Sequence, residues 1–126
     1  MHGAVKNALN HASITIANEM NSCNDNPIIY PEEGDGSALM GGNFDGSFLA
    51  IQADSLAIAM GNLAKLSERR IDRLVNRHLS GLPGFLIAYP GLNNGFMMPH
   101  YTAAGLLGEI KVLAHPSSID SVPTSA

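Results

Sequence analysis

The stretch SFLAIQADSLAIAM, residues 47–60, decides the fold of this chain. Its apolar side chains are spread over nearly every side of a helix, and the helical pattern continues to Leu79 with only Gly61 interrupting it. A helix without a polar face is buried on all sides. Because the sequence contains only two other helical segments, we expect some of the helices that surround this one to come from outside the chain.

The two other segments with helical spacing are residues 3–22 and residues 101–114, where apolar side chains recur every three or four positions. Between the first helix and the long one, residues 28–30 are β-branched or aromatic and precede an acidic, glycine-containing turn, which predicts a small hairpin. The sequence therefore predicts an all-α class. We expect a fragment of a long-helix bundle with a small hairpin or irregular insertion near residues 27–42.

Composition limits the classes of function. The chain has 126 residues, about the size of one domain, and only 14% of them are charged, against roughly a quarter in an average soluble domain. We therefore expect it to bury surface against a partner. The net charge of -4 argues against a general nucleic-acid binder.

Five of the seven cations lie in residues 65–77. Glu68 and Asp72 are interleaved with them, which favours an ion-paired helix face over a stripe that binds phosphate or nucleic acid. The phosphate-binding stripe is kept as a weaker alternative.

Several kinds of site are not supported by the sequence. No two histidines have the spacing of metal ligands, so no metal is expected, and no glycine-rich phosphate loop occurs. The single cysteine, Cys23, is expected to be a buried or interfacial thiol. No signal peptide is visible, and the apolar run of residues 48–60 is too short to span a bilayer. We expect a cytoplasmic protein with no membrane contact.

Asparagines in turns are the more informative polar residues. Asn26, Asn43 and Asn94 lie in turns rich in glycine or proline, and a carboxamide can orient a carboxylate or carbonyl in a dry pocket. Stabilisation of the turn itself is the alternative role. The turn of residues 41–44 would present an amide and the ring of Phe44 at the mouth of the long helix, whose start Asp45 or Ser47 can cap.

Six segments, taken in order, resemble the histidine and aromatic amino acid ammonia-lyases. They cover almost the whole chain: NDNPII (24–29), GGNF (41–44), LSERRI (66–71), GLP (81–83), LNNGFM (92–97) and LAHPSSIDSVPTSA (113–126). An ordered set of this kind is far more specific than one short motif.

This resemblance implies an all-helical homotetramer that eliminates ammonia from an L-amino acid with a methylidene-imidazolone (MIO) cofactor. In the family, an internal Ala-Ser-Gly forms the cofactor and a tyrosine removes the β-proton. Carried over by position, Asn26 and Phe44 would contact the cofactor or substrate, Met97 would lie near the substrate side chain, and Asn43 would support the site.

Departures from the family pattern narrow these expectations. The sequence contains no Ala-Ser-Gly, its nearest triplet being Leu79-Ser80-Gly81. The segments with the cofactor and the catalytic tyrosine would precede Met1, and one with an active-site glutamate would follow Ala126. Residues 1–126 are therefore expected to form a single central segment of an ammonia-lyase-like domain, truncated at both ends and inactive alone.

The substrate is open at this stage. The ending of residues 114–126 resembles histidine ammonia-lyases, so L-histidine is favoured, while tyrosine, phenylalanine and an aminomutase outcome are kept. Asp45 stands where the family commonly has histidine or glutamine, and Met97 where phenylalanine-specific relatives tend to have lysine. The alternative from another class is a non-catalytic helical oligomerisation or scaffold module.

Overall fold

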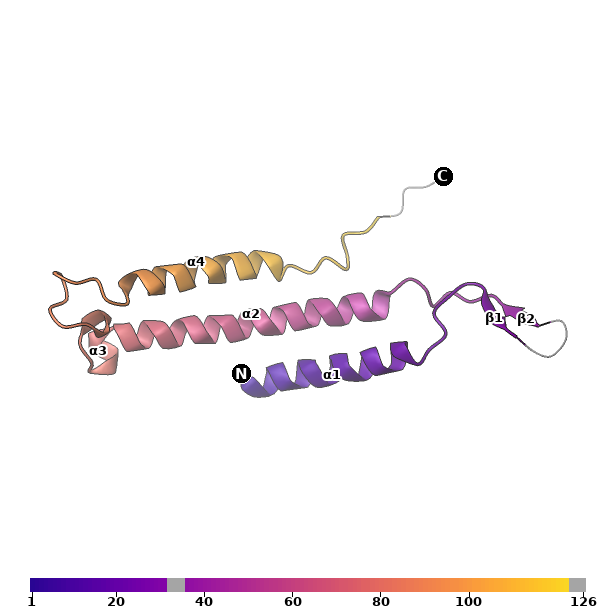
Figure 1. Cartoon of the computed structure of the whole chain (residues 1–126), viewed down its shortest axis with the longest axis horizontal. Helices are drawn as coiled ribbons and strands as arrows, with labels where there is room; N and C mark the ends of the chain where they lie inside the picture. The colour runs from indigo at the N-terminus through magenta and orange to yellow at the C-terminus, as the bar shows by residue number, and fades with distance from the viewer. Residues whose placement is uncertain (32–35, 123–126) are drawn as a thin grey trace. The chain divides into compact units, whose positions relative to one another are not determined.

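The computed structural model describes residues 1–31 and 36–122, and helices dominate it (Figure 1). In chain order the elements are α1 (His2–Met20), β1 (Ile28–Tyr30), β2 (Ser37–Leu39), α2 (Ser47–Val75), α3 (Arg77–Ser80), the 3-10 turn η1 (Gly84–Leu86) and α4 (Met97–Leu113). The predicted all-α class with a small insertion near residues 27–42 is confirmed.

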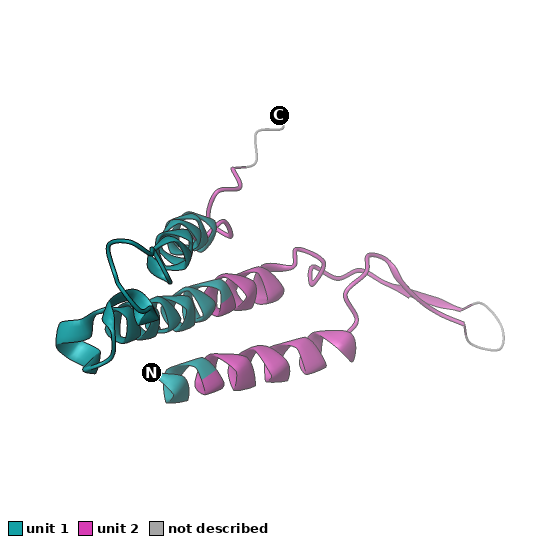
Figure 2. Ribbon diagram, turned by 60° about the vertical axis from the view of Figure 1, so that its left-hand side comes forward, with its two compact units in different colours: residues 1–5, 57–115 teal, residues 6–56, 116–126 magenta. Residues whose placement is uncertain are grey.

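The chain divides into two compact units, which Figure 2 shows in teal and magenta. Unit 1 contains residues 1–5 and 57–115, and unit 2 contains residues 6–56 and 116–126. Helix α2 contributes its C-terminal part to unit 1 and its N-terminal part to unit 2.

The insertion in unit 2 is a two-stranded antiparallel hairpin, in which Ile28 lies opposite Leu39 and Tyr30 opposite Ser37. The acidic residues 32–35 that are predicted to form its turn lie outside the described residues. Cys23, just before the hairpin, is exposed in this chain, with its Sγ 3.7 Å from the hydroxyl of Tyr30.

Helix α2 is bounded by a local hydrogen bond at each end. At its start the backbone N–H of Ser47 donates to Asp45 Oδ1 at 3.0 Å and the Ser47 hydroxyl donates to Oδ2 at 2.7 Å, so the predicted cap is confirmed. These two bonds hold the pKa of Asp45 below its usual value. After Val75 the Asn76 carboxamide accepts the His78 N–H at 3.0 Å and caps a new helix, α3. The prediction of one helical run to Leu79 is therefore wrong at Asn76.

Helix α4 begins at Met97, four residues before the predicted start at Tyr101. The difference arises because Pro99 lies in the first turn, where a helix does not use the backbone N–H that proline lacks. Within unit 1, α4 packs closely on α2 at Gly61. A methyl group added there would lie 3.8 Å from the Ala114 Cβ and 3.9 Å from the Ile110 Cγ2.

The described residues bury few apolar side chains, namely Val5, Ala12, Val75 and Leu107. Along α2, large apolar side chains such as Phe48, Ile51 and Met60 stay exposed. The burial on all sides that we expected for this helix is thus not supplied by the described part of the chain. By length and composition α2 is also able to cross a membrane, but the core helix of a soluble protein passes the same test.

Two glycines of unit 1 should respond oppositely to replacement by alanine. At Gly95, with φ of 48°, a Cβ would collide with the Phe85 carbonyl oxygen and lie 2.8 Å from the Ile87 Cβ. We expect Gly95→Ala to destabilise by about 1–3 kcal/mol through strain and overpacking. Gly61→Ala meets only ordinary contacts and should be neutral or stabilising by up to about 1 kcal/mol.

Thermal unfolding followed by circular dichroism measures both changes. Equal melting temperatures for the two variants would show that the crowding at Gly95 does not exist in solution.

Candidate functional site

Two groups of polar residues stand out, one in each unit. In unit 2, Asn26 and the turn of residues 41–44 come together: Asn26 Oδ1 accepts the Gly41 N–H at 3.4 Å, and Asn43 Nδ2 donates to the Ser22 hydroxyl at 3.5 Å. The end of α1, the approach to β1 and the approach to α2 thus meet at one place. The structure brings Asn26 and Asn43 into one cluster, which we call the carboxamide turn (residues 22, 26 and 41–44).

The carboxamide turn leaves groups available for a ligand. Within the described residues, the Nδ2 group of Asn26 has no hydrogen-bond acceptor, whereas its oxygen holds the turn. The Phe44 side chain is 59% exposed at the entry to α2. In Asn26, the side-chain oxygen therefore stabilises the turn, and the side-chain nitrogen is the atom left to orient a ligand.

Met97 belongs to unit 1, where it is the first residue of α4 and is partly buried. The loop before it closes on itself, because the Met97 N–H donates to the Asn94 carbonyl at 3.0 Å and Asn93 Nδ2 donates to the Ala88 carbonyl at 3.0 Å. The Asn93 carboxamide therefore stabilises the turn, whereas Asn94 contributes only its backbone carbonyl.

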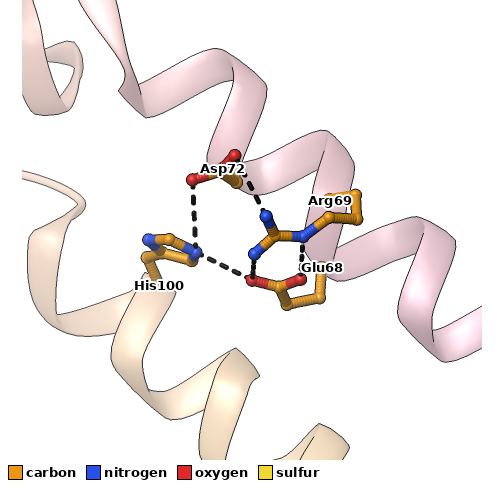
Figure 3. A network of polar contacts seen from close by, with 4 residues as sticks. All are labelled: Glu68, Arg69, Asp72 and His100. Carbon is orange, nitrogen blue, oxygen red and sulfur yellow. Dashed lines mark hydrogen bonds and ion pairs between the residues drawn. The ribbon is translucent and has the colours of Figure 1, made fainter.

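The second polar group lies between α2 and α4 in unit 1, and Figure 3 shows it from close by. Glu68 is only 5% exposed, and Arg69 donates to both of its carboxylate oxygens at 2.5 Å. The Nε2 of His100 lies 2.9 Å from Glu68 Oε1, and Arg69 also pairs with Asp72 at 3.4 Å. The predicted ion pairing of Glu68 and Asp72 is confirmed, and we call this set of four residues the Glu68 cluster.

The cluster determines the charge of Glu68. Hydrogen bonds from Arg69 and then from His100 lower the pKa of this carboxyl from 4.5 to about 2, against the opposing effect of burial. The Arg69 pKa is raised by the same contact. Glu68 is therefore a carboxylate at any physiological pH.

An open pocket of about 550 Å³ lies beside the Glu68 cluster. Asp72, Asn76 and His100 line it, together with Phe85 from the loop that follows α3. Phe85, Leu86 and Tyr89 have positive φ angles of 53°, 57° and 53°. Three non-glycine residues in the left-handed region within five positions mark a strained loop.

Sequence reasoning missed two side chains that tie segments together. The spacing of the histidines indicates single surface or interface residues, and it does not identify Glu68, 32 residues away, as the partner of His100. Asp54, on α2 in unit 2, accepts the backbone N–H groups of Ser117 at 3.3 Å and Ser118 at 2.9 Å. A carboxylate within an apolar helix was the available signal for Asp54. In the described part of the chain, no group of three or more histidine, cysteine or acidic side chains could hold a metal ion.

Solved structures show the same fold at high similarity. The chain superposes on histidine ammonia-lyase from Trypanosoma cruzi with a TM-score of 0.89 at 45% identity, covering 99% of this chain and 24% of that one. For a tyrosine aminomutase from Streptomyces globisporus the TM-score is 0.87 at 42% identity, covering 98% of this chain and 23% of that one.

Sequence relatives define the family. Histidine ammonia-lyase 2 of Fusobacterium nucleatum is 52% identical and histidine ammonia-lyase of Geobacillus kaustophilus 53% identical, each over 127 aligned residues that cover 100% of this chain and 25% of the relative. All residues, 1–126, match the family described as aromatic amino acid lyase. The chain belongs to that family, and it spans about a quarter of the length of these relatives.

The Glu68 cluster predicts a specific acid sensitivity. Because the native pKa of Glu68, about 2, lies below its ordinary value of 4.5, the stabilisation is complete above pH 4.5 and is lost as the pH falls toward 2. Glu68→Gln should remove this part of the acid sensitivity. It should also lower stability at neutral pH, because Arg69 and His100 lose their charged acceptor.

Melting temperatures between pH 2 and pH 7 check this prediction. Glu109→Gln is the matched control, because Glu109 is exposed on α4 and forms no ion pair with any residue that the structure describes. The prediction fails if wild type and Glu68→Gln lose stability in parallel over this range.

Proposed function

We propose that this chain is the central segment of a carbon–nitrogen lyase that eliminates ammonia from an L-amino acid, with conversion of L-histidine to urocanate as the favoured reaction. The observation that carries the proposal is the carboxamide turn, where Asn26 and the exposed ring of Phe44 are presented at the start of α2. Identity of 52% and 53% to proteins named histidine ammonia-lyase supports the choice of histidine.

A second outcome has its own support. The similarity to a tyrosine aminomutase, at 42% identity, keeps tyrosine as a substrate and a 2,3-amine shift as a reaction. Phenylalanine is kept as the third candidate substrate. Met97, an apolar and adaptable side chain, is the residue we assign to contact the substrate side chain.

Each residue of the carboxamide turn has a distinct role in the proposal. The Nδ2 group of Asn26 donates to a carbonyl or carboxylate of the ligand, since its own oxygen is already used by Gly41. Phe44 supplies a flat apolar surface, and Asn43 fixes the turn through Ser22. Holding the amino acid in register in this way lowers the entropy cost of reaching the transition state.

The cofactor implied by the family is MIO, which supplies an electrophile that makes the amino group a better leaving group. A planar polar ring fits the carboxamide turn, because an apolar face and an unsatisfied amide donor lie there together. This sequence contains no Ala-Ser-Gly, so we propose that the cofactor and the catalytic tyrosine come from the rest of a longer protein and that this chain forms no cofactor alone.

We also propose that the parent protein assembles with copies of itself as a homotetramer in the cytoplasm, without nucleic-acid or membrane partners. The many large apolar side chains exposed along α2 and along α4 support self-assembly, since apolar surface exposed in such quantity is typical of a protein interface. In this proposal, other copies of the protein cover the apolar side chains of α2 and α4.

The test is deamination by the full-length protein that carries this sequence. With L-histidine, L-tyrosine and L-phenylalanine as substrates, release of ammonia and the ultraviolet absorbance of the unsaturated acid are followed. Phe44→Ala should lower kcat/KM by about 10- to 100-fold by loosening the bound geometry. Phe44→Tyr is the matched control, because it keeps a flat ring at this exposed position and should cost much less.

No reaction of the intact protein with any of the three amino acids would refute the lyase proposal. Stable self-association without deamination would instead support the helical oligomerisation module.

A further inference from the structure

We propose that His100 is a positioning residue that sets selectivity for the amino acid side chain, by holding the first turn of α4, and with it Met97, against α2. The inference rests on the proposed function, because it takes Met97 as the contact to the substrate. It concerns the Glu68 cluster, to which the proposed reaction assigns no role.

The first turn of α4 is weakly held by its own residues. Phe96 occupies the N-cap position without a side-chain hydrogen bond, and no acidic residue lies in the first turn. A capping side chain at this place would stabilise the start of the helix. The direction in which α4 starts must therefore be fixed by contacts outside the helix.

Two such contacts exist within unit 1. On the loop side the Phe96 N–H donates to the Phe85 carbonyl at 2.9 Å. On the side of α2 the His100 Nε2 lies 2.9 Å from Glu68 Oε1, with 19% of the imidazole exposed. Figure 3 shows this bond reaching from α4 to α2. The first bond holds the backbone, and the second fixes the rotation of α4 about its axis.

The acceptor of the second bond is itself rigid. Arg69 binds both oxygens of Glu68, so the carboxylate is oriented by its own helix before His100 meets it. The ring of Tyr101 lies nearly parallel to the imidazole, with 6.4 Å between centroids. The fixed acceptor restrains His100, whose Nε2 also lies 4.0 Å from Asp72 Oδ1 on the same helix as Glu68.

The geometry of a helix transmits this restraint to Met97. Residues three apart lie on neighbouring positions of one helix face, so Met97 and His100 move together when the helix turns. A misplacement of about 1 Å can change a rate by about 100-fold, and a methylene-sized change of fit in an apolar pocket changes discrimination between substrates by about 10-fold or more. Selectivity between amino acids is therefore the property that should respond to His100.

The experiment uses the full-length protein and the ratio of kcat/KM for L-histidine to that for L-tyrosine. His100→Leu, which cannot donate to Glu68, should change this ratio by about tenfold, with KM affected more than kcat. His100→Gln keeps an amide donor and should stay within about threefold of wild type. His78→Leu is the control. The His78 side chain lines the same 550 Å³ pocket as His100, but it makes no side-chain hydrogen bond among the described residues.

The coupling to Met97 is tested by combining variants. In a Met97→Ala background, His100→Leu should change the ratio little further, since residues that act through one another are not additive. An unchanged ratio in His100→Leu, or the same tenfold change in both backgrounds, would overturn the inference.

Amide hydrogen exchange separates this outcome from failure of the proposed function. Exchange at the backbone N–H groups of Met97 and residue 100, which donate to Asn94 and Phe96, should rise in His100→Leu and not in His100→Gln. Unchanged exchange refutes the positioning role, whether or not the protein is active. If exchange rises but wild type deaminates no amino acid, the proposed function has failed and the selectivity role falls with it.

Discussion

The apolar surface of α2 is the constraint on which the rest of the structure depends. Phe48, Ile51 and Met60 stay exposed although each would contribute about 1.5–3 kcal/mol if fully buried. The helix is nevertheless well defined, because Asp45 and Asn76 bound it through local hydrogen bonds. Its limits are thus set by neighbours in sequence, whereas the described residues leave much of its apolar surface uncovered.

Within unit 1, a polar contact helps to hold two helices together, as apolar packing commonly does in proteins. Glu68 is the one charged side chain that the described residues bury, and it joins α2 to α4 through His100. Burying a carboxylate without its partners costs folding free energy. The pairing therefore favours the arrangement of the two helices in which His100 meets Glu68. Close packing at Gly61 and the crowded Gly95 then limit how far that arrangement can shift.

Sequence patterns predicted the elements better than their ends. The three-to-four spacing located α1 and α2, and the β-branched residues at 28–30 located the hairpin. The break at Asn76 was missed because a carboxamide cap competes with an otherwise continuous helical period. Helix α4 starts four residues before the apolar spacing indicates, because a first turn tolerates Pro99.

For the candidate site, the sequence predicted the residues but not which of them meet. Gly41 and Asn26 are 15 residues apart, and only the folded hairpin brings them together. His100 and Glu68 lie on separate helices, so no periodicity within either one indicates their contact. The roles assigned to Asn26, Phe44 and Met97 come from the family resemblance and stay predictions.

Asp54 on α2 holds the segment after α4 through two hydrogen bonds, and these bonds depend on one side chain and on two backbone groups. Its carboxylate oxygens accept backbone N–H groups, not the hydroxyls of Ser117 and Ser118. Any residue except proline supplies the same donor at those two positions. For these two bonds, the requirement for a particular side chain falls on Asp54, whereas residues 117 and 118 contribute only their backbone.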